Sequence, residues 1–181
     1  MDDILTLTLA QAETRGLALV LTRDPARKTK TELIASLILK GPLFLVSGDE
    51  WLPSYLLPHL LRERTTAIKE ILDRLHTVRA STCYRLYDSL ASLPSHGEPV
   101  LVLDFLHTFY DTDIPLRTRL FRLRECCREL SRLAFYRPVL VITQEREGEE
   151  YEKFIPALFS IADLHSTIAP DPEIIQQPAL L

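Results

Sequence analysis

A lysine and a threonine lie side by side where an apolar run gives way to an expected helix. The run is Leu17–Leu21, and the polar segment after it ends in Lys30 and Thr31. A lysine followed by a hydroxyl residue at a strand–helix junction is the pair with which a phosphate-binding loop holds nucleotide phosphates and Mg²⁺. Two glycines in that loop let the backbone approach the phosphates, and here Asp24 and Thr29 occupy their positions. The pair therefore indicates a phosphate-binding loop that has lost its backbone cradle.

The same segment also fits an ordinary basic turn between a strand and a helix. Arg27 and Lys28 add positive charge that would attract a phosphate, but charge does not restore the backbone geometry. Asp24 would place a negative charge beside the same phosphate. The residues alone leave both interpretations open.

Polar side chains also follow three other apolar runs. Asp104 comes directly after four apolar residues, which is the form of a Walker B strand, whose aspartate holds Mg²⁺ in P-loop ATPases. Glu50 follows a second run and could activate a water, and Gln144 follows a third. Because ligands bind at the carboxyl ends of the strands in a parallel α/β sheet, these residues and Lys30 are expected to meet at one edge.

The elements that must position these residues are buried strands joined by helices. Most of the runs are apolar at every position, which suits strands covered on both faces, and parallel pairing demands helical crossovers. The sequence therefore predicts one three-layer αβα domain, class α/β, with a mainly parallel central sheet over residues 17–168. Strands are expected at residues 17–21, 43–46, 75–79, 100–103 and 139–142, and helices at about 31–39 and 116–135.

The two ends of the chain are expected to lie outside this core. Residues 1–16 predict an N-terminal helix that ends at Gly16. Residues 169–181 contain three prolines and predict an irregular tail.

Composition limits the classes of function. The 181 residues are 46% hydrophobic and 25% charged, which is typical of a globular domain. A net charge of -4 argues against a uniformly basic DNA-binding domain, so DNA contact would need a local patch or a partner. The three cysteines form no CxxC pair, the N-terminus has no secretion signal, and no apolar run approaches the ~18 residues of a membrane span. These features favour a cytoplasmic or nuclear protein.

Four arginines share one face of the helix expected at residues 116–135. That face is either solvated and paired with local acids, or it contacts phosphate, in which case Arg124 and Arg128 are the candidate nucleic-acid contacts. The four residues are Arg117, Arg124, Arg128 and Arg132.

In order and spacing, these segments resemble the ATPase core of the RecA family, especially archaeal and eukaryotic recombinases and their paralogues. Residues 41–56 look like that family's second core strand with its catalytic glutamate, and residues 72–80 look like its next strand. Residues 100–104 match its Walker B strand, and residues 130–144 match the helix and strand before its second DNA-binding loop. The resemblance covers about residues 17–168.

The resemblance implies a role for each candidate residue. Lys30 and Thr31, assisted by Lys28, would bind the phosphates of ATP, and Thr31 and Asp104 would hold Mg²⁺. Glu50 would activate the attacking water. Gln144 would sense the γ-phosphate.

Two departures from the family pattern change the expected function. Both glycines of the phosphate-binding loop are missing, and the position of the second DNA-binding loop is taken by the acidic residues 145–152, which would repel DNA. Such losses resemble those of degenerate paralogues of the Shu-complex type, which work as heteromeric assembly partners. The resemblance thus implies a non-catalytic subunit in recombinational DNA repair that binds other RecA-like subunits, as a homo- or hetero-oligomer, and needs no cofactor.

Two alternatives stay open. One is a weak or unusual Mg²⁺-ATP-dependent ATPase of the RecA family, in which the surviving residues still work. The other is a RecA-like scaffold subunit of a complex unrelated to DNA repair, similar to the RecA-like subunits of Elongator-type complexes. If the protein acts on DNA, the contact is expected to be made through a partner.

Overall fold

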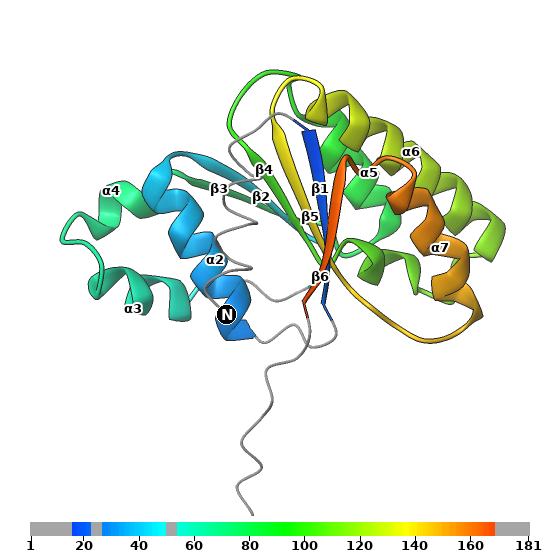
Figure 1. The fold of residues 1–181 in the computed structure, drawn as a ribbon, viewed down its shortest axis with the longest axis horizontal. Helices are drawn as coiled ribbons and strands as arrows, with labels where there is room; N and C mark the ends of the chain where they lie inside the picture. The colour runs from blue at the N-terminus through cyan, green and yellow to red at the C-terminus, as the bar shows by residue number, and fades with distance from the viewer. Residues whose placement is uncertain (1–15, 23–26, 50–53, 169–181) are drawn as a thin grey trace, which may run out of the picture.

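Six parallel strands form the centre of the computed structural model, which describes residues 16–22, 27–49 and 54–168 (Figure 1). Their order across the sheet is β3-β2-β4-β5-β1-β6, and every neighbouring pair is parallel. The predicted α/β class and parallel sheet are confirmed. The strands are β1 (Gly16–Thr22), β2 (Leu43–Ser47), β3 (Leu75–Arg79), β4 (Val100–Leu103), β5 (Pro138–Gln144) and β6 (Leu164–Ile168).

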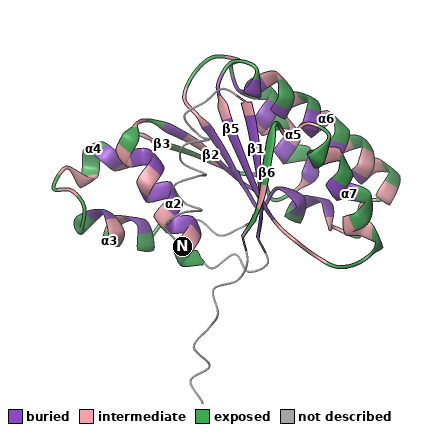
Figure 2. Cartoon of the chain, viewed as in Figure 1, coloured by how far each residue is buried: buried purple, intermediate pink, exposed green. Residues whose placement is uncertain are grey.

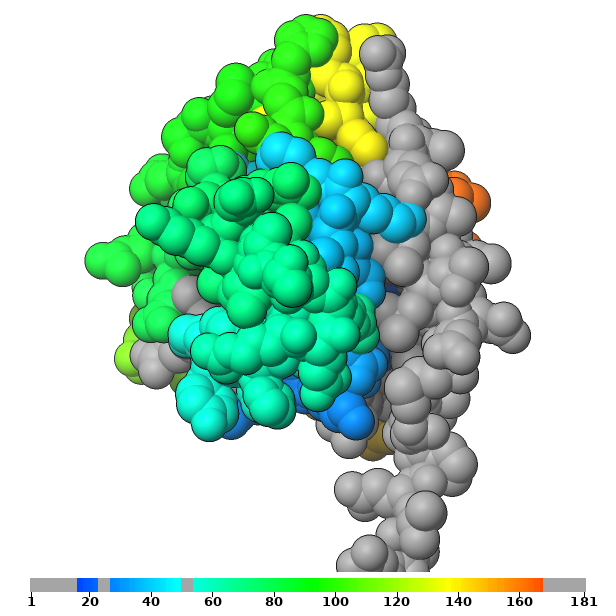
Figure 3. Space-filling view, turned by 90° about the vertical axis from the view of Figure 1, so that its left-hand side faces the viewer, coloured from blue at the N-terminus to red at the C-terminus, as the bar shows by residue number. Residues whose placement is uncertain are grey.

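Helices cover both faces of the sheet and complete the three predicted layers. Helices α2 (Arg27–Lys40), α3 (Leu56–Arg62) and α4 (Ile68–Leu72) pack on one face, and α3 and α4 form the outer part of that side (Figure 3). The other face carries the 3₁₀ helix η1 (Phe105–Phe109) and the helices α5 (Cys83–Ser92), α6 (Leu116–Ala134) and α7 (Glu149–Phe159). No helix in the described ranges is long and apolar enough to cross a bilayer.

The chain changes face when it changes direction across the sheet. From β1 to β2 to β3 it moves toward one edge, with α2, α3 and α4 on one face. From β3 through β4 and β5 to β6 it moves back, with α5, α6 and α7 on the other face. Crossovers of a single hand require this change.

Strand β1 shows why the central runs are apolar throughout. Leu17, Leu19 and Leu21 pack into the core beneath α5, α6 and α7, whereas Ala18 and Val20 pack into the core beneath α2. Because successive side chains point to opposite faces, a strand covered on both sides needs apolar residues at every position.

The edge strands are less buried than the central strands (Figure 2). In β3, Leu75 and Val78 are half-buried while His76 and Thr77 are exposed, as expected for a strand at the edge of the sheet. Strand β6 was not predicted, because its sequence LHSTI is not an apolar run.

The start of α2 differs from its predicted position, whereas the end of α6 agrees with it. Helix α2 begins at Arg27, not near Thr31, whereas α6 ends within one residue of its predicted end. Gly16 is the first residue of β1, with φ 129°. The rest of the predicted N-terminal helix and the predicted tail 169–181 lie outside the described residues.

Candidate functional site

Three strand ends lie next to one another at the carboxyl edge of the sheet. Strands β1 and β4 flank β5, so the turns that lead to Lys30, Asp104 and Gln144 adjoin one another. The chain after β1 passes to the α2 face, whereas the chain after β4 and β5 passes to the opposite face. Such a divergence marks the place where open α/β sheets bind ligands.

At this edge a buried ion pair joins Lys30 to Asp104. The Lys30 Nζ donates to Oδ1 and Oδ2 of Asp104, with both N···O distances 2.6 Å. The side chains are only 8% and 10% exposed. Two opposite charges removed from water in this way hold each other firmly, because separating them would leave a charge in the protein interior.

The backbone at Asp104 is held in an unusual conformation. Among the described residues it is the only non-glycine with positive φ, at φ 54° and ψ 39°. Its carbonyl accepts a hydrogen bond from the N–H of His107, at 2.9 Å. Such strained residues persist only where the surroundings fix them.

Gly48 is one of those surroundings. Its N–H donates to the carbonyl of Leu103 at 2.8 Å, and a Cβ on Gly48 would lie 2.4 Å from the carbonyl oxygen of Asp104. The loops after β2 and β4 therefore approach each other too closely for any side chain at position 48.

Thr31, the expected Mg²⁺ ligand, is fully buried in α2. Its hydroxyl donates to the carbonyl of Arg27 at 2.7 Å, one turn earlier in the same helix. Because α2 begins at Arg27, Thr31 is its fifth residue, and its backbone N–H belongs to the helical hydrogen-bonding pattern. The hydroxyl is thus engaged inside the helix. Lys28 is exposed in the first turn and takes no part in the buried pair.

Of the other two predicted site residues, the described part of the structure includes Gln144 and not Glu50. Gln144 ends β5, half-buried, in register with Thr22 at the end of β1. The residue before it, Thr143, accepts a hydrogen bond from the N–H of Leu106 at 3.1 Å and so ties β5 to the turn after β4. Glu50 lies outside the described residues.

Arg119 supports the turn after β4 and was missed by the sequence analysis. Its guanidinium donates to the Phe109 carbonyl at 2.8 Å and to both carboxylate oxygens of Glu150 at 2.9 and 2.7 Å. These hydrogen bonds lower the pKa of Glu150 and raise the pKa of Arg119. The sequence signal was its position next to Leu120, on the apolar side of the predicted helix and off the arginine face.

Replacing Arg119 with methionine is expected to destabilise the protein by about 2 kcal/mol, because the Phe109 carbonyl loses its donor and Glu150 loses its partner. Glu150 is partly exposed, so water recovers some of the loss. Arg119→Lys should keep only part of the stability, since an ammonium group lacks the planar guanidinium that donates to both oxygens of Glu150. Urea unfolding measures the change. Arg117→Met, at an exposed position of the same helix, should change stability by less than about 0.5 kcal/mol. Equal losses of stability in the two methionine variants would contradict the structural role of Arg119.

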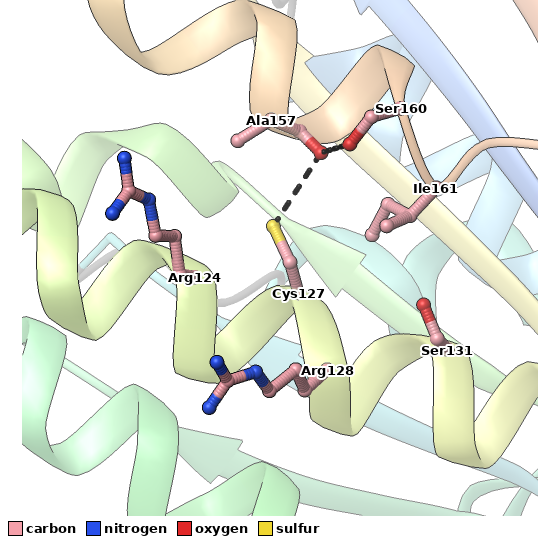
Figure 4. Close-up of a pocket in the computed structure, with 7 residues that line it drawn as sticks. All are labelled: Arg124, Cys127, Arg128, Ser131, Ala157, Ser160 and Ile161. Atoms are coloured by element: carbon pink, nitrogen blue, oxygen red, sulfur yellow. Dashed lines mark hydrogen bonds between the residues drawn. The ribbon is translucent and has the colours of Figure 1, made fainter.

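The predicted arginine face of α6 divides into two parts. Arg132 is paired with Glu129 and donates to two carbonyls of the α5 end, so it is structural. Arg124 and Arg128 are exposed and form no ion pair within the described part of the chain. They border a groove of about 390 Å³ between α6 and α7, shown in Figure 4. Its other lining residues are Cys127, Ser131, Ala157, Ser160 and Ile161.

The acidic segment 145–152 is only partly a loop. Its second half forms the first turn of α7, where Glu149, Glu150 and Glu152 favour the helix by facing the positive end of its dipole. One of these acids, Glu150, is also the partner of Arg119.

No protein-family model matches the sequence, and no curated protein matches it.

Proposed function

We propose that the chain is a non-catalytic RecA-like subunit that acts by protein–protein assembly in recombinational DNA repair. The observation that carries the proposal is the buried Lys30–Asp104 pair. The groups that would hold a nucleotide phosphate and its metal ion hold each other instead.

The strand arrangement supports the RecA-like part of the proposal. The resemblance assigns the phosphate lysine to the turn after β1, the metal acid to the end of β4 and the sensor to the end of β5. These strands are neighbours in the order β4-β5-β1, so Lys30 and Asp104, 74 positions apart in sequence, reach one edge of the sheet.

The hydrogen bonds at that edge support the non-catalytic part. A bound phosphate would require Lys30 to leave Asp104, and a bound metal ion would require the Thr31 hydroxyl to leave the Arg27 carbonyl. Breaking a buried ion pair costs about 3–5 kcal/mol, which corresponds to at least about 100-fold in affinity. A loop without glycines offers few backbone donors to offset that loss.

We expect a fluorescent ATP analogue with Mg²⁺ to show no saturable binding at concentrations up to about 1 mM, a free energy weaker than about 4 kcal/mol. Equilibrium titrations followed by anisotropy measure it, on the native chain and on Lys30→Ala. The exposed Lys69→Ala, in α4, is the matched control, because it removes the same charge without touching the buried pair.

Micromolar binding that is lost in Lys30→Ala and kept in Lys69→Ala would overturn the non-catalytic proposal. It would favour the second candidate, a weak Mg²⁺-ATP-dependent ATPase, for which the meeting of Lys30 and Asp104 is the favourable observation. The third candidate, a scaffold outside DNA repair, is separated by the partners that co-purify with the chain: RecA-like recombination subunits support the proposal, and subunits of another complex contradict it.

A further inference from the structure

Helices α6 and α7 lie side by side on the outer surface of one face (Figure 1). Two contacts fix their relative position: Arg119 pairs with Glu150, and the Cys127 thiol donates to the Ala157 carbonyl at 3.7 Å. The helices therefore run parallel, and a residue of α6 lies level with the residue about thirty positions later in α7.

The outer row of α6 is cationic and aromatic. Phe121, Arg124, Arg128 and Phe135 recur at helical spacing on its exposed side. The phenylalanines are 54% and 73% exposed, and about 20 Å of helix separates them. Arginine and aromatic residues are enriched in protein–protein interfaces and often supply much of the binding energy. The row is positively charged, although the chain as a whole has a net charge of -4.

The outer row of α7 is acidic and then apolar. Glu149 and Glu152 are exposed near its start; the Glu149 side chain is 90% exposed, with only a 3.5 Å contact to Lys153. Phe159 at its end is 40% exposed, and Leu164, the first residue of β6, is 49% exposed. The groove between the two rows is open to an apolar side chain (Figure 4).

We propose that this face is the interface of a symmetric dimer, in which α6 of each copy packs on α7 of the other. A two-fold interface uses the same patch twice, so the patch must be self-complementary. A cationic row beside a parallel acidic row meets that requirement, with a two-fold axis parallel to the helices. Arg124 then lies less than one turn from the level of Glu152 in the second copy, and Phe135 lies toward the apolar end of α7 in that copy. The dimer does not depend on whether ATP binds.

Sedimentation velocity on the full chain, from about 1 μM to about 100 μM, tests the proposal. These concentrations span the affinity of a modest interface. The native chain is expected to dimerise at low salt, and its dissociation constant should rise at least about tenfold near 1 M salt, where the Debye length falls to about 3 Å. Arg124→Glu with Arg128→Glu, and Glu149→Lys with Glu152→Lys, should each raise that constant at least about tenfold. An equimolar mixture of the two variants should recover the dimer, because the reversed charges match again.

The matched control is Arg62→Glu with Lys69→Glu, the same charge change at exposed residues of α3 and α4. It should dimerise like the native chain. Far-UV circular dichroism verifies the fold of each variant, and Arg124→Gln with Arg128→Gln serves if the reversal unfolds the protein.

Three outcomes would overturn the dimer. The native chain could sediment as a monomer throughout, or both reversals could leave the dimer unchanged. Alternatively, a labelled single-stranded oligonucleotide could bind the monomer and lose its affinity in the arginine reversal, which would assign the patch to DNA. Because nucleotide titration uses a different site, this failure is distinguishable from failure of the proposed function.

Discussion

Replacing Asp104 with asparagine should destabilise the protein by about 3–5 kcal/mol, because Lys30 would lose the carboxylate that both of its 2.6 Å contacts reach. Asparagine is close to aspartate in shape and tolerates the left-handed conformation at this position, so the change isolates the charge. Lys30→Met should cost a similar amount, since it leaves the carboxylate buried. Urea unfolding followed by circular dichroism gives both values.

The double variant Lys30→Met with Asp104→Asn decides between pairing and two separate losses. If the pair is the cause, the double variant should lose at least about 2 kcal/mol less than the sum of the single variants. Additive losses would contradict the pairing. A change below about 0.5 kcal/mol in each single variant would place both groups in contact with water.

The same cycle also bears on function. An ATPase needs Lys30 and Asp104 as separate charges, one for phosphate and one for the metal ion, whereas a scaffold needs only the volume and fixed geometry they supply. A double variant that is stable and still binds the same partners would favour the scaffold. Loss of partner binding in a well-folded double variant would instead give the charges a role beyond the fold.

The sheet was predictable because a strand that is buried on both faces needs apolar residues at every position. Strands such as Val100–Leu103 are apolar at every position, and no other common element requires that over so few residues. Strand β6 lies at the edge of the sheet beside β1, and most of its described side chains are exposed. Its sequence therefore has no run of apolar residues, and its pairing with β1 depends on tertiary contacts.

The start of α2 shows a competition between two patterns. Fitting Lys30 and Thr31 to a phosphate-binding loop placed the helix start near Thr31, although Asp24-Pro25 is itself a helix-start signal. In the structure the helix extends back to Arg27, so the functional template was the weaker guide to local conformation.

The sequence predicted which residues meet at the candidate site, but it did not predict the contacts between them. The rule that ligands bind at carboxyl ends of strands brought Lys30 and Asp104 to one edge, and the structure places them there. Local spacing does not encode how they bond. The ion pair joins residues 74 positions apart, Gly48 approaches the backbone of Asp104, and Arg119 pairs with Glu150, 31 positions later in the chain.

Gly48→Ala should be about as damaging as breaking the ion pair, with an expected loss of about 3 kcal/mol. Its Cβ would lie 2.4 Å from the Asp104 carbonyl oxygen, a backbone atom that cannot rotate away. The loop after β4 would have to move, and the Lys30–Asp104 geometry would move with it. Thermal and urea unfolding measure the loss.

Gly41→Ala is the matched control for that substitution. No atom lies within 4 Å of the Cβ position there, so alanine should be neutral or stabilise by up to about 1 kcal/mol through the unfolded chain. If Gly48→Ala proved as mild as Gly41→Ala, the loops after β2 and β4 would have to separate easily. Asp104 would then be free to leave Lys30, and the main argument against a working phosphate site would fall. A large loss at Gly48 alone would instead mean that the edge of the sheet is built as one rigid unit, in which the charges are fixed by the backbone and not reserved for a ligand.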